Sequence, residues 1–146
     1  MKPTNESILV FKFGGASVKS AAAIDNVIDI LKLYADRKIV VVVSAMGKTT
    51  NQLESLFDAA LNQEKDLFIS RKEALHAFHI EIVKALFSDD VYENIKNKIN
   101  LVFDEIIDFY NEKSDKSRGQ LYDSFVSFGE HLSSIILQFK IRQDLN

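Results

Sequence analysis

Two short runs of apolar, mostly β-branched residues lie in the first third of the chain and set the limits on its fold. Residues 7–13 (SILVFKF) and 38–44 (KIVVVVS) lack strict alternation of apolar and polar residues, which is typical of parallel strands covered on both faces. Between them an apolar stripe recurs at helical spacing: Ile24, Val27, Ile28, Leu31, Tyr34 and Ala35. The pattern predicts a strand–helix–strand unit with a right-handed crossover.

The remainder, residues 51–146, has helical periodicity throughout. We expect a first helix that begins at a capping box formed by Asn51 and Glu54, because an Asn N-cap with Glu three residues later is a helix start signal. A second helix should end near residues 88–90, and a third should end in a polar loop at residues 111–119. A fourth is expected from about Gln120 to Phe139.

These elements predict one incomplete α/β domain over residues 1–146, with a strand–helix–strand front at 7–50 and a helical region at 51–146. Two parallel strands cannot make a sheet that is buried on both faces and protected at both edges. We therefore expect the chain to be the front portion of a longer α/β domain.

Composition excludes several classes of function. The 146 residues carry a net charge of −3 and no cysteine, which argues against nucleic-acid binding, disulfides and thiolate chemistry. No apolar run approaches the roughly 20 residues of a membrane span. The polar start of the chain does not resemble a secretory signal, so we expect a cytoplasmic protein that does not contact membranes.

The most informative turn follows the first strand. Ligands of open α/β sheets bind beyond the carboxyl ends of the strands, where Gly14 and Gly15 are placed to expose backbone N–H groups to phosphate, with Lys12 adding charge. The alternative is a plain tight turn beside a surface lysine. Ala16 breaks the Rossmann glycine pattern, and Val42 stands where a Walker A loop requires its first glycine.

Two further segments carry candidate binding residues. The loop at 44–51 (SAMGKTTN) offers Ser44 and Thr50 to a carboxylate or phosphate, although ordinary helix capping explains its polar residues equally well. Glu130 is flanked by Ser127 and Ser134 at helical spacing and follows Gly129. Because glycine inside a helix costs about 1 kcal/mol, this position suggests close approach of a ligand or another backbone; the alternative is an exposed glutamate.

The helix before residue 88 also carries Glu73, His76 and His79 at i, i+3 and i+6. A carboxylate-bridged metal site requires a second Glu-x-x-His on a partner helix, and the sequence has none. We interpret these three residues as ordinary helix residues and expect no protein-bound metal site.

Three segments together resemble aspartate kinases of the amino-acid kinase superfamily: Lys12-Phe-Gly-Gly-Ala-Ser-Val18, Val-Val-Ser44-Ala-Met-Gly-Lys-Thr-Thr-Asn51 and Ser127-Phe-Gly-Glu130-His-Leu-Ser133. The resemblance covers about residues 7–140 and implies the N-terminal part of that family's three-layer fold. One departure is Ala16, where the family usually has threonine.

The resemblance implies ATP- and Mg²⁺-dependent phosphorylation of the side-chain carboxylate of L-aspartate, the first step towards lysine, threonine and methionine. It implies that Lys12 neutralises the transferring phosphoryl group, with Phe13, Gly14 and Gly15 beside the nucleotide. Ser44 and Thr50 would contact aspartate, and Glu130 would hold its ammonium group. Phosphoryl transfer of this kind depends on positioning and charge neutralisation.

The family's later glycine-rich segment (Gly-Arg-Gly-Gly-Ser-Asp type), its nucleotide-base pocket and its regulatory ACT domains have no counterpart in these 146 residues. We therefore expect this polypeptide alone to lack kinase activity, and we expect its exposed sheet to favour a homo-oligomer such as a dimer. Two alternatives stay open: another amino-acid kinase, acting on glutamate, acetylglutamate, carbamate or a nucleoside monophosphate, or a non-catalytic helical interaction module.

Overall fold

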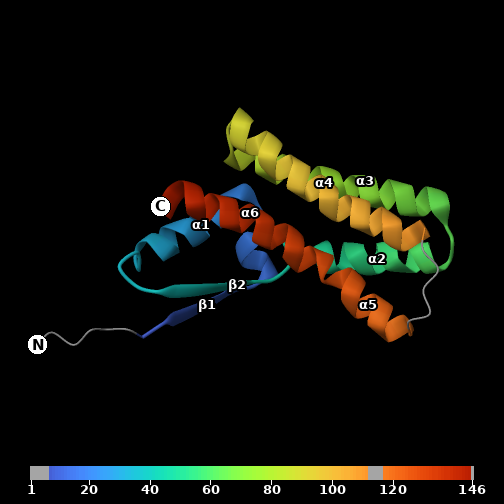
Figure 1. Cartoon of the computed structure of the whole chain (residues 1–146), viewed down its shortest axis with the longest axis horizontal. Helices are drawn as coiled ribbons and strands as arrows, with labels where there is room; N and C mark the ends of the chain where they lie inside the picture. Colours follow the sequence, from blue (N-terminus) through green and yellow to red (C-terminus); the bar gives the residue numbers. More distant parts are fainter. Residues whose placement is uncertain (1–6, 112–116, 146) are drawn as a thin grey trace, which may run out of the picture.

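A computed structural model of the chain describes residues 7–111 and 117–145. A two-stranded sheet lies on one side of the molecule, and helices cover one of its faces (Figure 1). In chain order the elements are β1 (Leu9–Phe13), the 3-10 turn η1 (Gly15–Val18), α1 (Ala21–Lys32), β2 (Ile39–Val43), α2 (Thr49–Leu61), α3 (Lys65–Leu86), α4 (Asp89–Asn111), α5 (Arg118–Val126) and α6 (Phe128–Leu145). The predicted α/β class with a largely helical remainder is confirmed.

The two strands are parallel, with Leu9 opposite Ile39 and Phe13 opposite Val43. Exposure alternates along both strands, so helices cover one face of the sheet and the other is exposed, as the sequence predicts for a sheet of only two strands. Phe13 and its alternating neighbours face the helices, while Val10, Val40 and Val42 remain between 46% and 68% exposed. The uncovered face is therefore mostly apolar, with three exposed valines and the charged Lys12.

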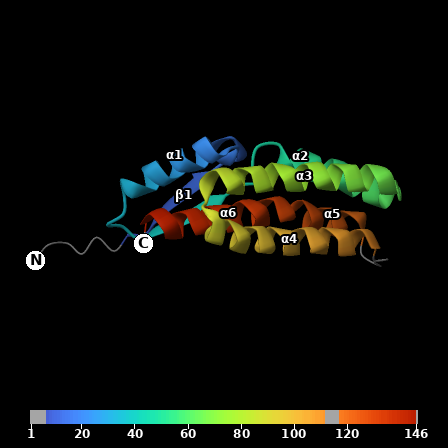
Figure 2. The same cartoon turned by 90° about the horizontal axis from the view of Figure 1, so that it is seen from above.

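Helix α6 places the C-terminal end of the described chain beside its first elements. It contacts α1, β2 and α4, and in Figure 1 it lies between the sheet and the α3–α4 pair. Figure 2 shows α3 and α4 running along each other, with α6 drawn between them in this view and extending towards α1 and the strands. The chain therefore folds back on itself, with its described C-terminal end beside the strands.

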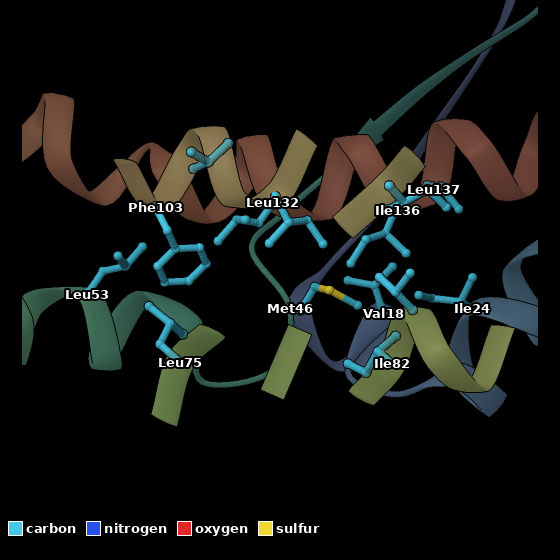
Figure 3. Packing of buried hydrophobic residues seen from close by; sticks show 14 of the residues in the cluster. Val18, Ile24, Met46, Leu53, Leu75, Ile82, Phe103, Leu132, Ile136 and Leu137 are labelled. Atoms are coloured by element: carbon cyan, nitrogen blue, oxygen red, sulfur yellow. The ribbon is translucent and has the colours of Figure 1, made fainter. Parts of the chain in front are cut away.

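One continuous apolar core joins the sheet side to the helical side. Figure 3 shows Val18, Met46 and Ile136 gathered between the turn after β1, the loop after β2 and α6. Further along, the Phe57 ring lies 5.5 Å from the Phe125 ring and 5.7 Å from the Phe109 ring. These contacts fix α5 and α4 against α2.

The predicted fourth helix is two helices. A capping box of Ser117 and Gln120 starts α5, and the helix stops at Ser127, which separates it from α6. The expected polar loop at 111–119 falls largely on residues outside the described chain. Among the residues that the structure describes, no helix has both the length and the apolar character that a membrane crossing demands.

Candidate functional site

The turn after β1 and the loop after β2 are fixed to each other at the carboxyl edge of the sheet. The backbone N–H of Ser44 donates to the Phe13 carbonyl at 3.0 Å, and the N–H of Gly47 donates to the Gly15 carbonyl at 2.9 Å. Gly47 adopts a φ of +55°, a left-handed conformation that glycine tolerates without strain. The expected meeting of the two loops is confirmed.

The paired glycines have different reasons for lacking a side chain. A Cβ atom at Gly15 would lie 2.7 Å from the backbone oxygen of Ala45, so this glycine is required for the packing of one loop on the other. A Cβ atom at Gly14 would have no neighbour within 4 Å. The open side of the turn therefore lies at Gly14, where a ligand could approach the backbone.

Helix α2 begins at the second loop with unpaired N–H groups. It starts at Thr49, its N-cap Lys48 makes no side-chain cap, and the N–H groups of Thr50 and Asn51 have no backbone acceptor within the described chain. The predicted capping box of Asn51 and Glu54 is therefore wrong; Glu54 instead accepts a hydrogen bond from the Tyr122 hydroxyl at 2.5 Å. An uncapped helix N-terminus carries partial positive charge that favours an anion.

Glu130 lies at the start of α6 and is directed towards this same region. Its Oε1 accepts a hydrogen bond from the backbone N–H of Ala45 at 3.4 Å, across 85 residues of sequence. Ala45 follows Ser44 directly, so the structure brings Ser44 and Glu130 together. The backbone of Ala45 is a site component that sequence reasoning missed, because an alanine between two predicted elements gives no chemical signal.

Gly129 explains how α6 comes so close. A Cβ atom at Gly129 would lie 2.7 Å from the Cβ of Ala45 and 3.4 Å from the Cγ2 of Thr49. The close approach inferred from the sequence is thus confirmed, and its partners are the second loop and the start of α2. The hydroxyl of Ser127 donates instead to the Ser124 carbonyl at 2.7 Å, so Ser127 does not belong to the polar notch expected around Glu130.

Thr49 is a second residue that the sequence did not single out. Its side chain is fully buried, and its Oγ1 has no hydrogen-bond partner among the described residues. It occupies the first position of α2, between the second loop and α6. Its neighbour Thr50 is half-buried and so remains accessible to a ligand.

Lys12 lies on β1, one residue before Phe13, with an exposed side chain. The alternation along the strand places it on the uncovered face of the sheet, beside Val10 and opposite Val42. Lys12 is therefore not in the Glu130 group. Within the described chain Lys12 makes no ion pair, so no neighbouring carboxylate neutralises its charge.

His76 and His79, the two histidines that follow Glu73 on α3, both contact other residues of the helical region. His76 shares a hydrogen bond of 2.8 Å with Asn100 of α4. His79 is fully buried, and its Nδ1 lies 2.8 Å from the Leu75 carbonyl. Burial lowers the pKa of His79 from 6.5 to about 4, so its imidazole is neutral at physiological pH.

Comparison with known proteins shows which family and which relatives the chain is similar to. A model of the amino acid kinase family matches residues 7–143. The chloroplastic aspartokinase 1 of Arabidopsis thaliana is 34% identical over 135 residues, which are 87% of this chain and 22% of that protein. Aspartokinase 2 of Bacillus subtilis (strain 168) is 40% identical over 72 residues, 45% of this chain and 18% of its own length.

Among solved structures, the chain is similar to E. coli aspartokinase III in complex with aspartate and ADP (R-state). The TM-score is 0.79 and the sequence identity 26%, over 94% of this chain and 29% of that one. The chain thus matches between 18% and 29% of the length of these relatives.

Proposed function

The chain belongs to the amino acid kinase family, and we propose that it forms the phosphate turn and the amino-acid site of an aspartate kinase. The reaction is transfer of the γ-phosphoryl group of ATP to the side-chain carboxylate of L-aspartate, which gives 4-phospho-L-aspartate and ADP. A carboxylate oxygen forms the new bond to phosphorus while the bond to the bridging oxygen of ADP breaks. The attacking carboxylate carries no proton, so no general base is needed.

The observation that carries the proposal is the hydrogen bond between Glu130 and the backbone of Ala45. It holds a carboxylate beside the uncapped N-terminus of α2. The Glu130 carboxylate favours an ammonium group, and the N-terminus of α2 favours a carboxylate. Together they match the two charges of an amino acid. In this proposal the ammonium of aspartate binds Glu130, its α-carboxylate binds at Thr50 and Ser44, and its side chain is directed towards the glycine turn.

The nucleotide would bind on the other side of that turn. The open space at Gly14 allows phosphate oxygens to reach the backbone, and the adjacent Lys12 would neutralise charge on the transferring group. Within the described residues no cluster of three His, Asp or Glu side chains could hold a metal ion. In this proposal Mg²⁺ would bind with the ATP phosphates and keep several of its water ligands, as is usual for this ion.

Ligand binding by this chain alone tests the amino-acid site. In an NMR titration of the ¹⁵N-labelled chain, L-aspartate should shift the amide signals of Ala45, Thr50 and His131, while L-glutamate and N-acetyl-L-glutamate should not. Glu130→Gln keeps an acceptor for Ala45 but removes the charge, and should weaken aspartate binding by about tenfold, or ~1.4 kcal/mol. Glu105→Gln, at an exposed position of α4, is the matched control.

Preference for glutamate, or equal affinities of the Glu130 and Glu105 variants for aspartate, would reject the assignment. A coupled assay of ADP release adds a second readout. We expect the 146-residue chain alone to give no aspartate-dependent ADP, because it spans only 22% of the plant relative. Robust turnover would show that the site needs no further residues.

A further inference from the structure

A hollow of about 390 Å³ lies between α3 and α4, away from the residues assigned to aspartate. It is lined by Lys72, Glu73, His76, Asn100, Phe103, Asp104 and Ile107. Its volume falls within the range of roughly 300–1,000 Å³ that small-molecule sites occupy. None of its lining residues belongs to the glycine turn, the loop after β2 or α6.

Interhelical contacts at two ends frame the hollow. At one end the Nε2 of His76 lies 2.8 Å from the Oδ1 of Asn100, and the His76 ring meets the Phe103 ring edge-on at 4.9 Å. At the other end the rings of Phe68 and Tyr110 stack with their centroids 4.4 Å apart. The helices are thus held at a fixed separation on both sides of the space, so the hollow is preformed.

Lys72 and Asp104, which carry opposite charges, lie across this space from each other without forming an ion pair. His76 is opposite Asn100, and the helices run antiparallel, as the Phe68–Tyr110 pair shows. Lys72, one turn before His76, therefore faces Asp104, one turn after Asn100. Within the described chain neither Lys72 nor Asp104 takes part in an ion pair, although both line the hollow.

The space continues into a smaller and more apolar cavity. This second hollow, of about 180 Å³, shares Lys72 and Ile107 with the first and adds the aromatic and aliphatic side chains of Phe68, Ile69 and Tyr110, with Lys65 and Asn111 beside them. A ligand that enters from the charged part would therefore meet aromatic and aliphatic surface one helical turn further along. Burial of an apolar group there would strengthen binding, because it removes apolar surface from water.

We propose that the α3–α4 hollow binds a small zwitterion, namely an α-amino acid with an aliphatic or aromatic side chain. Its carboxylate binds Lys72, its ammonium binds Asp104 and Glu73, and its side chain occupies the apolar extension. A single ligand that carries both charges completes the separated pair, whereas a simple anion or cation leaves one of them without a partner. The inference does not depend on the proposed kinase function, because the two sites share no residue.

The test is an NMR titration of the ¹⁵N-labelled chain with L-leucine, compared with two analogues that each lack one charge. L-Leucine should shift the amide signals of Lys72, Asn100 and Asp104 in a saturable way below about 20 mM. Isocaproate, without the ammonium, and isoamylamine, without the carboxylate, should bind about tenfold more weakly.

Two variants with matched controls complete the design. Lys72→Met on α3 and Asp104→Asn on α4 should each weaken L-leucine binding about fivefold to tenfold, while Lys98→Met and Asp108→Asn, at exposed positions of α4, should leave it unchanged. Equal binding of all three compounds, no saturation, or shifts confined to the loop at 44–51 and Glu130 would overturn the proposal. The last outcome would instead assign the zwitterion to the proposed substrate site.

Discussion

His79 should make the stability of this chain fall in mildly acidic solution. Its side chain is fully buried on α3. A carbonyl can only accept, so the Nδ1 that contacts the Leu75 carbonyl at 2.8 Å carries the ring proton. The Nε2 is buried and has no hydrogen-bond partner among the residues that the structure describes. Protonation would place an N–H and a positive charge there with no acceptor, which explains why burial lowers the pKa to about 4.

The direction and size of this pH effect follow from the pKa of His79 in the unfolded and in the folded chain. In the unfolded chain His79 takes up a proton near pH 6.5, whereas in the folded chain it does so only near pH 4. Its contribution to the free energy of unfolding is therefore complete above pH 6.5 and is lost as the pH falls towards 4. The full difference is about 3 kcal/mol, of which about 2 kcal/mol disappears between pH 7 and pH 5.

Urea unfolding followed by circular dichroism at pH 7, 6 and 5 measures this loss. His79→Leu keeps an apolar side chain of similar size and removes the titration, so the pH dependence of this variant should be flatter by about 2 kcal/mol over the same interval. His131→Leu, at an exposed position of α6, is the control and should retain the slope of the unmodified chain. Equal slopes for the His79 variant and the unmodified chain would refute the reasoning.

Three further predictions concern packing and self-association. Gly15→Ala should lower the melting temperature because its Cβ would lie 2.7 Å from a backbone oxygen of the second loop, whereas Gly14→Ala, which meets nothing within 4 Å, should not; equal melting temperatures would contradict this. Phe125→Ala removes the centre of the aromatic cluster and should cost about 3–5 kcal/mol in urea unfolding, so a loss below 1 kcal/mol would indicate a loosely packed cluster. Replacing the exposed Val40 and Val42 with threonine should reduce self-association in light scattering, and a monomeric unmodified chain would refute that proposal.

Local signals predicted the fold well where packing agreed with them. The β-branched run at 39–43 and the apolar stripe of α1 became the expected strand and helix, and His79 lies on a helix as expected. The start of α2 was misplaced because the buried side chain of Thr49 fixes the first turn, and burial is set by tertiary contacts. The break at Ser127 was missed because the apolar spacing continues across it.

The candidate site, like the fold, could be predicted only in part from the sequence. The glycine turn, the loop at 44–51 and Glu130 each had a chemical signal in the sequence. That Ala45 provides the N–H that holds Glu130, and that Gly15 is needed for packing while Gly14 stays open, follows only from contacts between distant segments. Spacing within one segment carries no information about such contacts.

The hydrogen bond between Ala45 and Glu130 also has a consequence for the order of folding. It closes a loop of 85 residues, and loop closure of that length costs about 4 kcal/mol of chain entropy. Local contacts such as those between α3 and α4 should therefore form first, and α6 should dock late. A ligand that contacts both Glu130 and the loop after β2 would then act mainly by slowing unfolding, with little effect on the rate of folding.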